Sequence, residues 1–221
     1  MPLETGKGKG VGKAGFYVPT IDIRPFLDDP SSVAAGEVVE MVRDACVSTG
    51  FFQITGHGIP AALQEAVFAG SRAFFALDGE EKKMLDKRRS VGSSNRGYEG
   101  IGNQGLQEGA LPDLKEGFYI GLETPASDPR VLAHAFKMMG PNLWPPLPLT
   151  TFHDPMTAYY TAIYALSLRI LDIVASTLTL PHGDSHAHVR AREAREFFHE
   201  FTANDPVASI RLLHYPPAPA T

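Results

Sequence analysis

Apolar positions in the first part of the chain change from a period of two residues to a helical period. Residues 18–23 alternate apolar and polar side chains, which predicts a short, half-buried strand. Further along, apolar side chains recur three or four residues apart, which predicts a helix that ends at Gly50. The stripe of this helix consists of Val38, Met41, Val42, Ala45 and Cys46.

A second strand and two more helices follow. Residues 51–55 form a compact β-rich run, and residues 56–60 contain the glycines and proline of a tight turn into a helix. Apolar side chains continue along that helix to Leu77, and Asp78 is placed to cap a third helix over residues 79–87. The pattern therefore predicts the order strand, helix, strand, helix, helix.

Loops and regular elements alternate in the rest of the chain. Residues 90–109 are rich in glycine and predict a long loop, whereas residues 114–122 have the composition of a strand. The later pattern predicts a proline-rich extended connection at 141–148, a long amphipathic helix at 152–180, a polar excursion at 182–195 and a strand at 208–215.

Composition and charge narrow the function classes. The 221 residues are 43% hydrophobic, so the chain can bury a sizeable core. Its net charge of -5 offers no basic stripe to neutralise phosphates, which excludes nucleic acid as an expected partner. The single cysteine, Cys46, cannot form an internal disulfide, and its place in the helical stripe predicts a buried, inert side chain.

Neither the N-terminal residues nor the longest apolar stretch predicts a membrane protein. Residues 1–16 lack the apolar run of a signal peptide and are interpreted as a flexible leader. Arg169 and Asp172 interrupt the longest apolar stretch, which favours a core helix over a membrane span. We therefore expect a cytoplasmic protein without a membrane partner.

Six short motifs occur in order and cover nearly the whole chain. They are Val-Pro-Thr-Ile-Asp at 18–22, Gly-Phe-Phe at 50–52 with Gly-His-Gly-Ile-Pro at 56–60, Phe-Phe-Ala-Leu at 74–77 with Glu-Lys at 81–82, Arg-Gly-Tyr at 96–98, Asp-Leu-Lys-Glu-Gly-Phe at 113–118, and Ser-Ile-Arg-Leu-Leu-His-Tyr-Pro-Pro at 209–217. Each motif alone is unspecific. Together they resemble the isopenicillin N synthase-like branch of the non-haem iron, 2-oxoglutarate-dependent dioxygenases.

The resemblance implies an α+β fold class. The chain would form the helical N-terminal cap region of a double-stranded β-helix, or jelly roll, whose β core is incomplete. The implied domains are the flexible leader at 1–16, a non-haem dioxygenase N-terminal domain at 17–125, a connecting segment at 126–207 that contains the core helix 152–180, and the first part of a truncated jelly-roll domain at 208–221.

Iron chemistry in this family depends on residues that we expect beyond this chain. The resemblance implies an iron held by His-x-Asp and a distant histidine, followed by an Arg-x-Ser that binds 2-oxoglutarate. These motifs come after the segment that matches residues 209–217. We therefore expect no catalytic residue, no metal ligand and no bound cofactor here, although Fe(II) and 2-oxoglutarate are implied for the complete enzyme.

One His-x-Asp does occur, from His182 to Asp184, with His186 and His188 close by. It lies in a polar stretch with no β-branched run to hold it on a sheet, and no Arg-x-Ser follows it. Solvated loop histidines, or adventitious binding of a transition metal, are the interpretations that fit this context.

Candidate ligand contacts rest on the resemblance. Tyr215 matches a tyrosine that reaches the 2-oxoglutarate carboxylate in relatives, and the alternative is a strand tyrosine that packs its ring. Leu213 stands where many relatives have asparagine, and His214 could replace that polar group. Arg96 and Tyr98 match a segment that borders the substrate pocket, where an arginine can pair with a substrate carboxylate. The alternative for Arg96 is an exposed side chain in a mobile loop.

The expected function follows from the family and is qualified by the missing iron motif. The complete enzyme would hydroxylate or desaturate a small molecule with Fe(II) and 2-oxoglutarate, and this chain would be an inactive, truncated form of it. The alternative is a non-catalytic binding or regulatory fragment derived from such an enzyme. Neither the substrate nor the oligomeric state is determined by the sequence.

Overall fold

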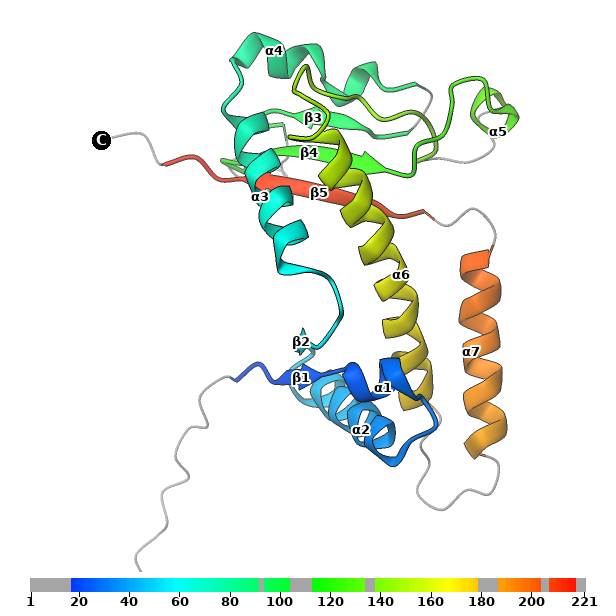
Figure 1. The fold of residues 1–221 in the computed structure, drawn as a ribbon. Coiled ribbons are helices and arrows are strands. Elements are labelled where there is room, and N and C mark those ends of the chain that lie inside the picture. Colours follow the sequence, from blue (N-terminus) through cyan, green and yellow to red (C-terminus); the bar gives the residue numbers. More distant parts are fainter. Residues whose placement is uncertain are drawn as a thin grey trace, which may run out of the picture. The chain divides into compact units, whose positions relative to one another are not determined.

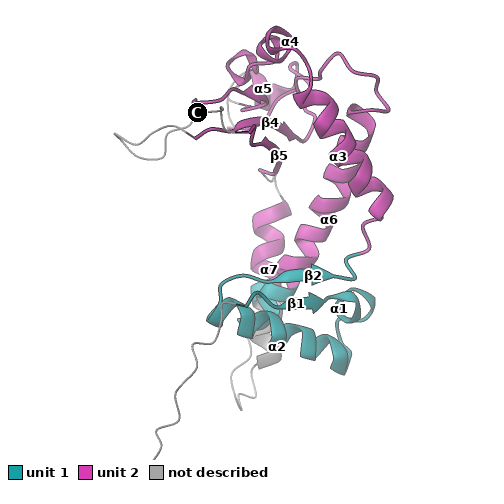
Figure 2. Ribbon diagram, turned by 90° about the vertical axis from the view of Figure 1, so that its left-hand side faces the viewer, with its two compact units in different colours: residues 1–57, 173–194 teal, residues 58–172, 195–221 magenta. Residues whose placement is uncertain are grey.

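A computed structural model describes residues 17–91, 94–103, 113–133, 138–178, 187–203 and 207–217 (Figure 1). The chain divides into two compact units (Figure 2). The N-terminal unit comprises residues 1–57 and 173–194, and the sheet unit comprises residues 58–172 and 195–221.

The N-terminal unit contains two short parallel strands and two helices, together with the end of α6 (His153–Thr177) and the first part of α7 (Ala187–Ala203). Strand β1 (Thr20–Asp22) pairs with β2 (Gln53–Thr55), as the alternation of apolar and polar residues predicts. Helix α1 (Arg24–Asp28) precedes α2 (Val33–Ser48), whose N-cap Ser32 accepts a hydrogen bond from the Ala35 amide. The buried side chains of residues 20–55 are Ile21, Ile23, Phe26, Ala35, Val38, Val39, Val42 and Ala45.

The prediction of a buried cysteine is wrong. Cys46 is exposed in the last turn of α2, next to Val47, which is also exposed. The buried face of this helix includes Val39 and excludes Met41, so the stripe read from the sequence was displaced to one side. Apolar residues on more than one side of a helix are compatible with a 100° rotation per residue. The face that is buried is therefore decided by packing.

Helices α3 (Ala61–Phe75) and α4 (Gly79–Met84) open the sheet unit. Pro60 is the N-cap of α3, and the two preceding glycines, Gly56 and Gly58, have φ values of 68° and 76°, so the predicted turn is confirmed. Asp78 and Glu81 form a capping box at α4, which ends earlier than predicted. A 3-10 turn, η1 (Lys87–Arg89), follows.

Three antiparallel strands form the sheet, in the order β3 (Gly97–Glu99), β4 (Glu116–Gly121) and β5 (Ser209–His214). Both β4 and β5 confirm predicted strands. Strand β3 falls inside residues 90–109, where a continuous loop was predicted, so that prediction is wrong. Its three residues pair with Gly117, Phe118 and Tyr119 of β4, a partner that local composition cannot reveal.

The core of the sheet unit lies where α3 and the start of α6 (His153–Thr177) pack on the sheet. Phe74 of α3 contacts Phe118 of β4, with ring centroids 4.3 Å apart, and Phe152 contacts both rings. The buried members of this cluster are Val67, Phe74, Tyr98, Phe118, Ile120, Phe152, Met156 and Leu212.

Helix α6 confirms the predicted long helix, although Leu178 lies beyond its end and is exposed. Its length and composition would also suffice for a helix that crosses a membrane. Core helices of soluble proteins can have the same length and composition, so the expectation of a core helix stays a prediction.

The remaining helices are α5 (Pro129–Leu132) and α7 (Ala187–Ala203). Because α7 begins at Ala187, the predicted polar excursion over 182–195 is wrong for its second half. Phe197 and Phe201 of α7 are exposed, and the ring of Phe197 lies 5.7 Å from that of Phe198.

Candidate functional site

The three-stranded sheet has two chemically different faces. Because side chains alternate along a strand and cross-strand partners share a side, each residue can be assigned to one face. The core face, packed on the aromatic cluster, carries Tyr98, Glu116, Phe118, Ile120, Ile210, Leu212 and His214. The opposite face, called the glycine face below, carries Gly97, Glu99, Gly117, Tyr119, Gly121, Arg211 and Leu213.

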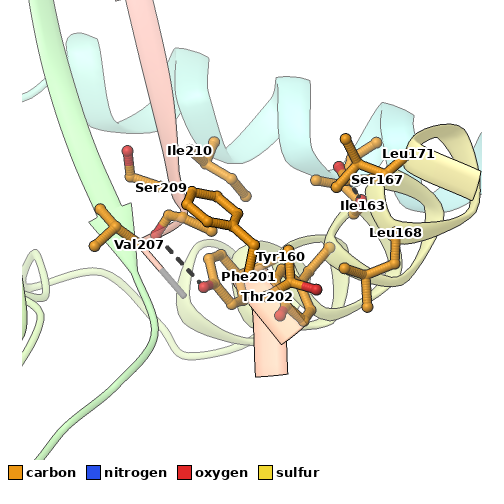
Figure 3. A pocket seen from close by; sticks show the side chains of 12 residues that line it. Tyr160, Ile163, Ser167, Leu168, Leu171, Phe201, Thr202, Val207, Ser209 and Ile210 are labelled. Atoms are coloured by element: carbon orange, nitrogen blue, oxygen red, sulfur yellow. Dashed lines mark hydrogen bonds between the residues drawn. The ribbon is translucent and has the colours of Figure 1, made fainter. Parts of the chain in front are cut away.

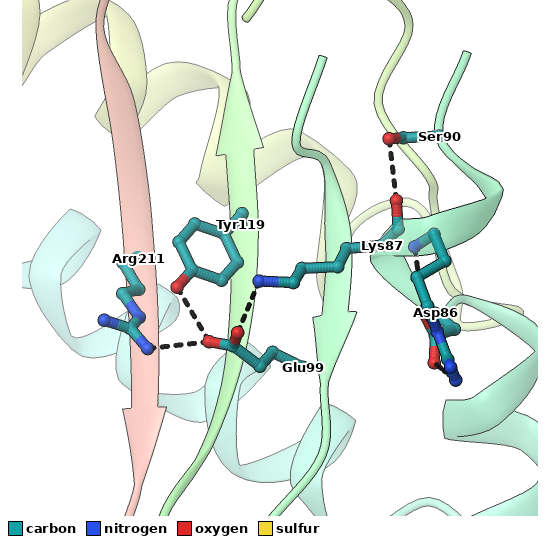
Figure 4. A network of polar contacts seen from close by, with 7 residues as sticks. Asp86, Lys87, Ser90, Glu99, Tyr119 and Arg211 are labelled. Atoms are coloured by element: carbon teal, nitrogen blue, oxygen red, sulfur yellow. Dashed lines mark hydrogen bonds and ion pairs between the residues drawn. The ribbon is translucent and has the colours of Figure 1, made fainter. Parts of the chain in front are cut away.

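A buried carboxylate connects all three strands on the glycine face. Glu99 of β3 accepts hydrogen bonds from the Tyr119 hydroxyl at 2.9 Å and from Arg211 Nη2 at 2.9 Å, and it pairs with Lys87 Nζ (Figure 4). The Arg211 guanidinium also lies 4.8 Å from the centroid of the Tyr119 ring. This network ties β3, β4, β5 and η1 together.

Opposing effects set the protonation state of that network. Burial disfavours the ionised form of Glu99, but the bonds from Lys87 and Tyr119 outweigh it and lower the pKa of the carboxyl. Burial, together with the bond to Glu99, raises the pKa of Tyr119 to about 12. Glu99 is therefore ionised and Tyr119 is neutral at pH 7.

A second buried carboxylate occupies the core face. Glu116 accepts hydrogen bonds from the Tyr98 hydroxyl at 2.6 Å, from Lys82 Nζ at 2.9 Å and from His214 Nδ1 at 2.8 Å. Burial disfavours ionisation of Glu116, but these bonds outweigh it and lower the pKa of the carboxyl. Burial and the bond to Glu116 raise the pKa of the Tyr98 phenol.

Arg96 is buried, so the alternative of an exposed loop arginine is wrong. Its guanidinium donates to the carbonyls of Ser94 and Met138, both at 2.8 Å, and lies against the backbone of Gly121. Burial lowers the pKa of this guanidinium. The predicted substrate contact of Arg96 stays a prediction, and any ligand would have to compete with these two carbonyls.

Tyr98 is likewise committed to a protein partner. It is buried on the core face, where its hydroxyl donates to Glu116, and the Lys82 ammonium lies 5.7 Å from its ring centroid. The motif that contains Arg96 and Tyr98 therefore brings together two buried side chains with structural partners. The substrate role of Tyr98 also stays a prediction.

Tyr215 follows β5 directly and is exposed, at 65% of its full accessible surface. Because Pro216 restricts Tyr215 to extended backbone, the alternation of β5 predicts that Tyr215 lies on the side of Leu213 and Arg211. Its phenol makes no hydrogen bond to the described residues and is available to a ligand.

His214 does not replace the polar group lost at Leu213, so that suggestion is wrong. The two residues are adjacent on β5 and face opposite sides of the sheet, as Leu213 contacts Gly117 while His214 bonds Glu116. Side chains on the same face of a strand are two positions apart, so His214 cannot take the place of a side chain at position 213. The sequence alone did not show which face each residue occupies.

Within the described ranges, no group of three His, Cys, Asp or Glu side chains could hold a metal ion. The His-x-Asp at His182 and Asp184, together with His186, lies outside the described residues. His188 lies in α7, and its side chain is not described. The part of the chain that the structure describes therefore does not fit the iron of this family.

Several apolar cavities adjoin β5, and sequence reasoning identified none of them. One, of about 730 Å³, lies between α6, the end of α7 and the start of β5, where Tyr160 donates to the Ala208 carbonyl at 3.4 Å (Figure 3). The rings of Tyr160 and Tyr164 stack at its wall. A smaller cavity, of about 360 Å³, lies between α3 and the residues Leu213 and His214.

Comparison with known proteins identifies the class to which this fold belongs. Residues 18–147 match the family model described as "non-haem dioxygenase in morphine synthesis N-terminal". The crystal structure of a full-length Neurospora crassa protein in complex with alpha-KG and thymine aligns with 93% of this chain and 57% of that protein, with a TM-score of 0.67 and 25% identity. The chain thus belongs to the non-haem iron, 2-oxoglutarate-dependent dioxygenase family, and the expected α+β class is confirmed.

Particular relatives are closer in sequence. The 2-oxoglutarate-dependent dioxygenase citB of Monascus ruber is 47% identical over 223 residues, which cover 100% of this chain and 60% of the relative. Clavatol oxidase claD of Penicillium crustosum is 42% identical over 212 residues, which cover 91% of this chain and 58% of the relative. The chain therefore spans about 60% of the length of these curated relatives.

Proposed function

We propose that the protein to which this chain belongs is an Fe(II)- and 2-oxoglutarate-dependent oxygenase that hydroxylates or desaturates a small molecule. The match over residues 18–147 carries this proposal, and 47% identity to a 2-oxoglutarate-dependent dioxygenase supports it. Iron and 2-oxoglutarate would supply the oxidation chemistry, while the protein supplies geometry and a dry pocket.

The residues of this chain contribute a scaffold and one ligand contact. Tyr215 presents a free phenol on the side of the sheet that carries Arg211, and a phenol donor suits a carboxylate of 2-oxoglutarate. Glycines at 97, 117 and 121 on that face are buried and are covered by other residues of this chain, among them Arg96 at Gly121. Arg96 and Tyr98 are proposed to border the substrate, and both also have the hydrogen bonds within the protein that are given above.

Taken alone, the 221-residue chain is proposed to be inactive. The described residues form no group that could hold iron, and oxygen activation in this family requires it. The same observation supports the second candidate, a non-catalytic binding or regulatory fragment. We further propose a cytoplasmic location without nucleic-acid or membrane partners, supported by the net charge of -5.

The two candidates are separated by reading the transcript past the codon for Thr221 and assaying both products. With Fe(II), ascorbate and carboxyl-labelled 2-oxoglutarate, we expect no labelled carbon dioxide from the 221-residue chain and release from a longer product. Turnover by the 221-residue chain would contradict the proposal and direct attention to His182, Asp184 and His186. A confirmed stop codon with binding but no turnover would favour the fragment.

A further inference from the structure

The position of Tyr215 depends on few constraints. Strand β5 ends at His214, and the pairing of His214 with Glu116 is the last in its register with β4. Tyr215 itself is exposed and has no hydrogen bond to the described residues. Pro216 limits its backbone to extended conformations but does not attach it to the sheet. The residue before it must therefore hold this end of the strand.

His214 has the contacts required for that role. Its Nδ1 lies 2.8 Å from Glu116 Oε1, and its ring lies 5.1 Å from the ring of Phe75 at an interplanar angle of 30°. One side of the imidazole is thus bonded to the neighbouring strand, and one face is packed on α3. The side chain remains 42% exposed.

Glu116 is a rigid partner for this contact. Only 5% of its side chain is exposed, and its other oxygen is shared by the Tyr98 hydroxyl at 2.6 Å and Lys82 Nζ at 2.9 Å. Lys82 Nζ also donates to the carbonyl of Phe75 at 3.2 Å. Through these hydrogen bonds, the carboxylate connects α3, α4 and β3 to the end of β5.

We infer that His214 is a positioning residue for Tyr215. By bonding Glu116 on the core face, it fixes the end of β5 and directs the next side chain, Tyr215, to the glycine face. An effect of this contact on 2-oxoglutarate binding rests on the proposed function. The hydrogen bond between the imidazole and the buried carboxylate is independent of that function.

Charged and titratable groups on the neighbouring elements lie near His214. Arg72 of α3 lines the same cavity as His214, and Glu116 of β4 bonds its ring. Lys82 of α4 and Tyr98 of β3 are the other donors to Glu116. Among the described residues, Glu116 is the hydrogen-bond partner of the imidazole.

A fluorine probe on Tyr215 tests the positioning directly. With 3-fluorotyrosine at position 215, the His214→Phe variant keeps the ring contact with Phe75 but loses the hydrogen bond, whereas His214→Asn keeps a donor near the place of Nδ1. We expect the fluorine resonance of His214→Phe to move to its unfolded-state position and that of His214→Asn to stay within the folded range. His153→Phe is the matched control, because His153 Nδ1 also bonds a carboxylate, Asp154, at 2.8 Å. A His214→Phe spectrum equal to that of the wild type in a folded protein would overturn the inference.

Affinity for 2-oxoglutarate separates this inference from the proposed function. In a product of the length of the relatives, loaded with Mn(II) in place of iron, we expect calorimetry to give a dissociation constant about tenfold higher for His214→Phe, the equivalent of about 1.4 kcal/mol. His214→Asn should restore most of the affinity. If Tyr215→Phe leaves the affinity unchanged while the fluorine results hold, the cofactor role of Tyr215 fails and the positioning role stands. If Tyr215→Phe weakens binding but His214→Phe does not, the positioning role fails.

Discussion

At the scale of single residues, glycines on the sheet make room for other parts of the chain. A Cβ added at Gly121 would lie 2.0 Å from Arg96 Nη2, and one added at Gly97 would lie 2.3 Å from the carbonyl oxygen of Leu85. Gly97 also has a φ of 105°, which other residues rarely adopt. Arg96 can be buried because Gly121 has no side chain, whereas Gly97 allows the close approach of the Leu85 carbonyl.

Replacing Gly121 tests this dependence. Gly121→Ala should displace the Arg96 guanidinium and lower the free energy of unfolding by about 1–3 kcal/mol, the usual range for overpacked sites. Gly36→Ala is the control, because Gly36 lies inside α2 with no atom within 4 Å of an added Cβ, and it should raise stability by about 0.5–1 kcal/mol. Urea unfolding measures both, and equal effects of the two changes would contradict the packing argument.

At the scale of elements, one buried carboxylate on each face joins the strands. Glu99 bonds β4 and β5 on the glycine face, whereas Glu116 bonds β3 and β5 on the core face. Hydrophobic packing by itself does not distinguish strand registers that differ by two residues. Because each carboxylate must meet its donors to offset the cost of burial, the two networks select one register.

These carboxylates predict sensitivity to acid. Both pKa values are lowered on folding, so their contribution to stability is complete above the unfolded value of 4.5 and is lost as the pH falls through the folded values. Thermal unfolding temperatures of the chain should therefore fall steeply below about pH 4.5. Glu116→Gln should reduce the slope in this range and lower stability at pH 7 by about 1–3 kcal/mol. A variant with an unchanged slope would show that Glu116 is not linked to folding.

At the scale of the whole molecule, the described part of the chain exposes a strand edge together with apolar side chains. Strand β5 pairs only with β4 among the described strands, and Phe68, Phe201 and Leu213 beside the cavities along β5 are exposed. An open edge beside apolar surface is a site for association. The 221-residue chain is therefore expected to self-associate.

Two charged substitutions test that expectation. Phe68→Lys combined with Phe201→Lys should shift the light-scattering mass of the 221-residue chain toward the monomer at micromolar concentration. Val33→Lys, at a residue that is 85% exposed in the first turn of α2, is the control and should leave the mass unchanged. If association persists in the double variant and disappears in the control, the surface that mediates association lies elsewhere.

Local features of the sequence were sufficient for much of the fold. Hydrophobic periodicity located α2, α3, α6, β4 and β5, and Asp78 correctly marked the start of α4. A helix or a helix cap depends on residues within a few positions of each other, so the necessary information lies within one segment. Ordered motifs added the family, which the comparisons confirm.

Burial, face and partner were decided only by the tertiary structure. Cys46 is exposed, Arg96 is buried and β3 exists because of neighbours that are distant in sequence. A charged residue at 116 on the apolar side of a strand was the one available signal of a buried network, since the alternation places it with Phe118 and Ile120. Its donors come from separate elements.

The sequence by itself determined where most helices and strands form and to which family the chain belongs, because short-range periodicity and motif order carry that information. Tertiary structure decided that Leu213 and His214, adjacent in the chain, lie on opposite faces of the sheet. It also decided that Glu116 and Glu99 could be buried as anions. Such assignments require contacts between residues up to 112 positions apart, and only the folded chain brings those residues together.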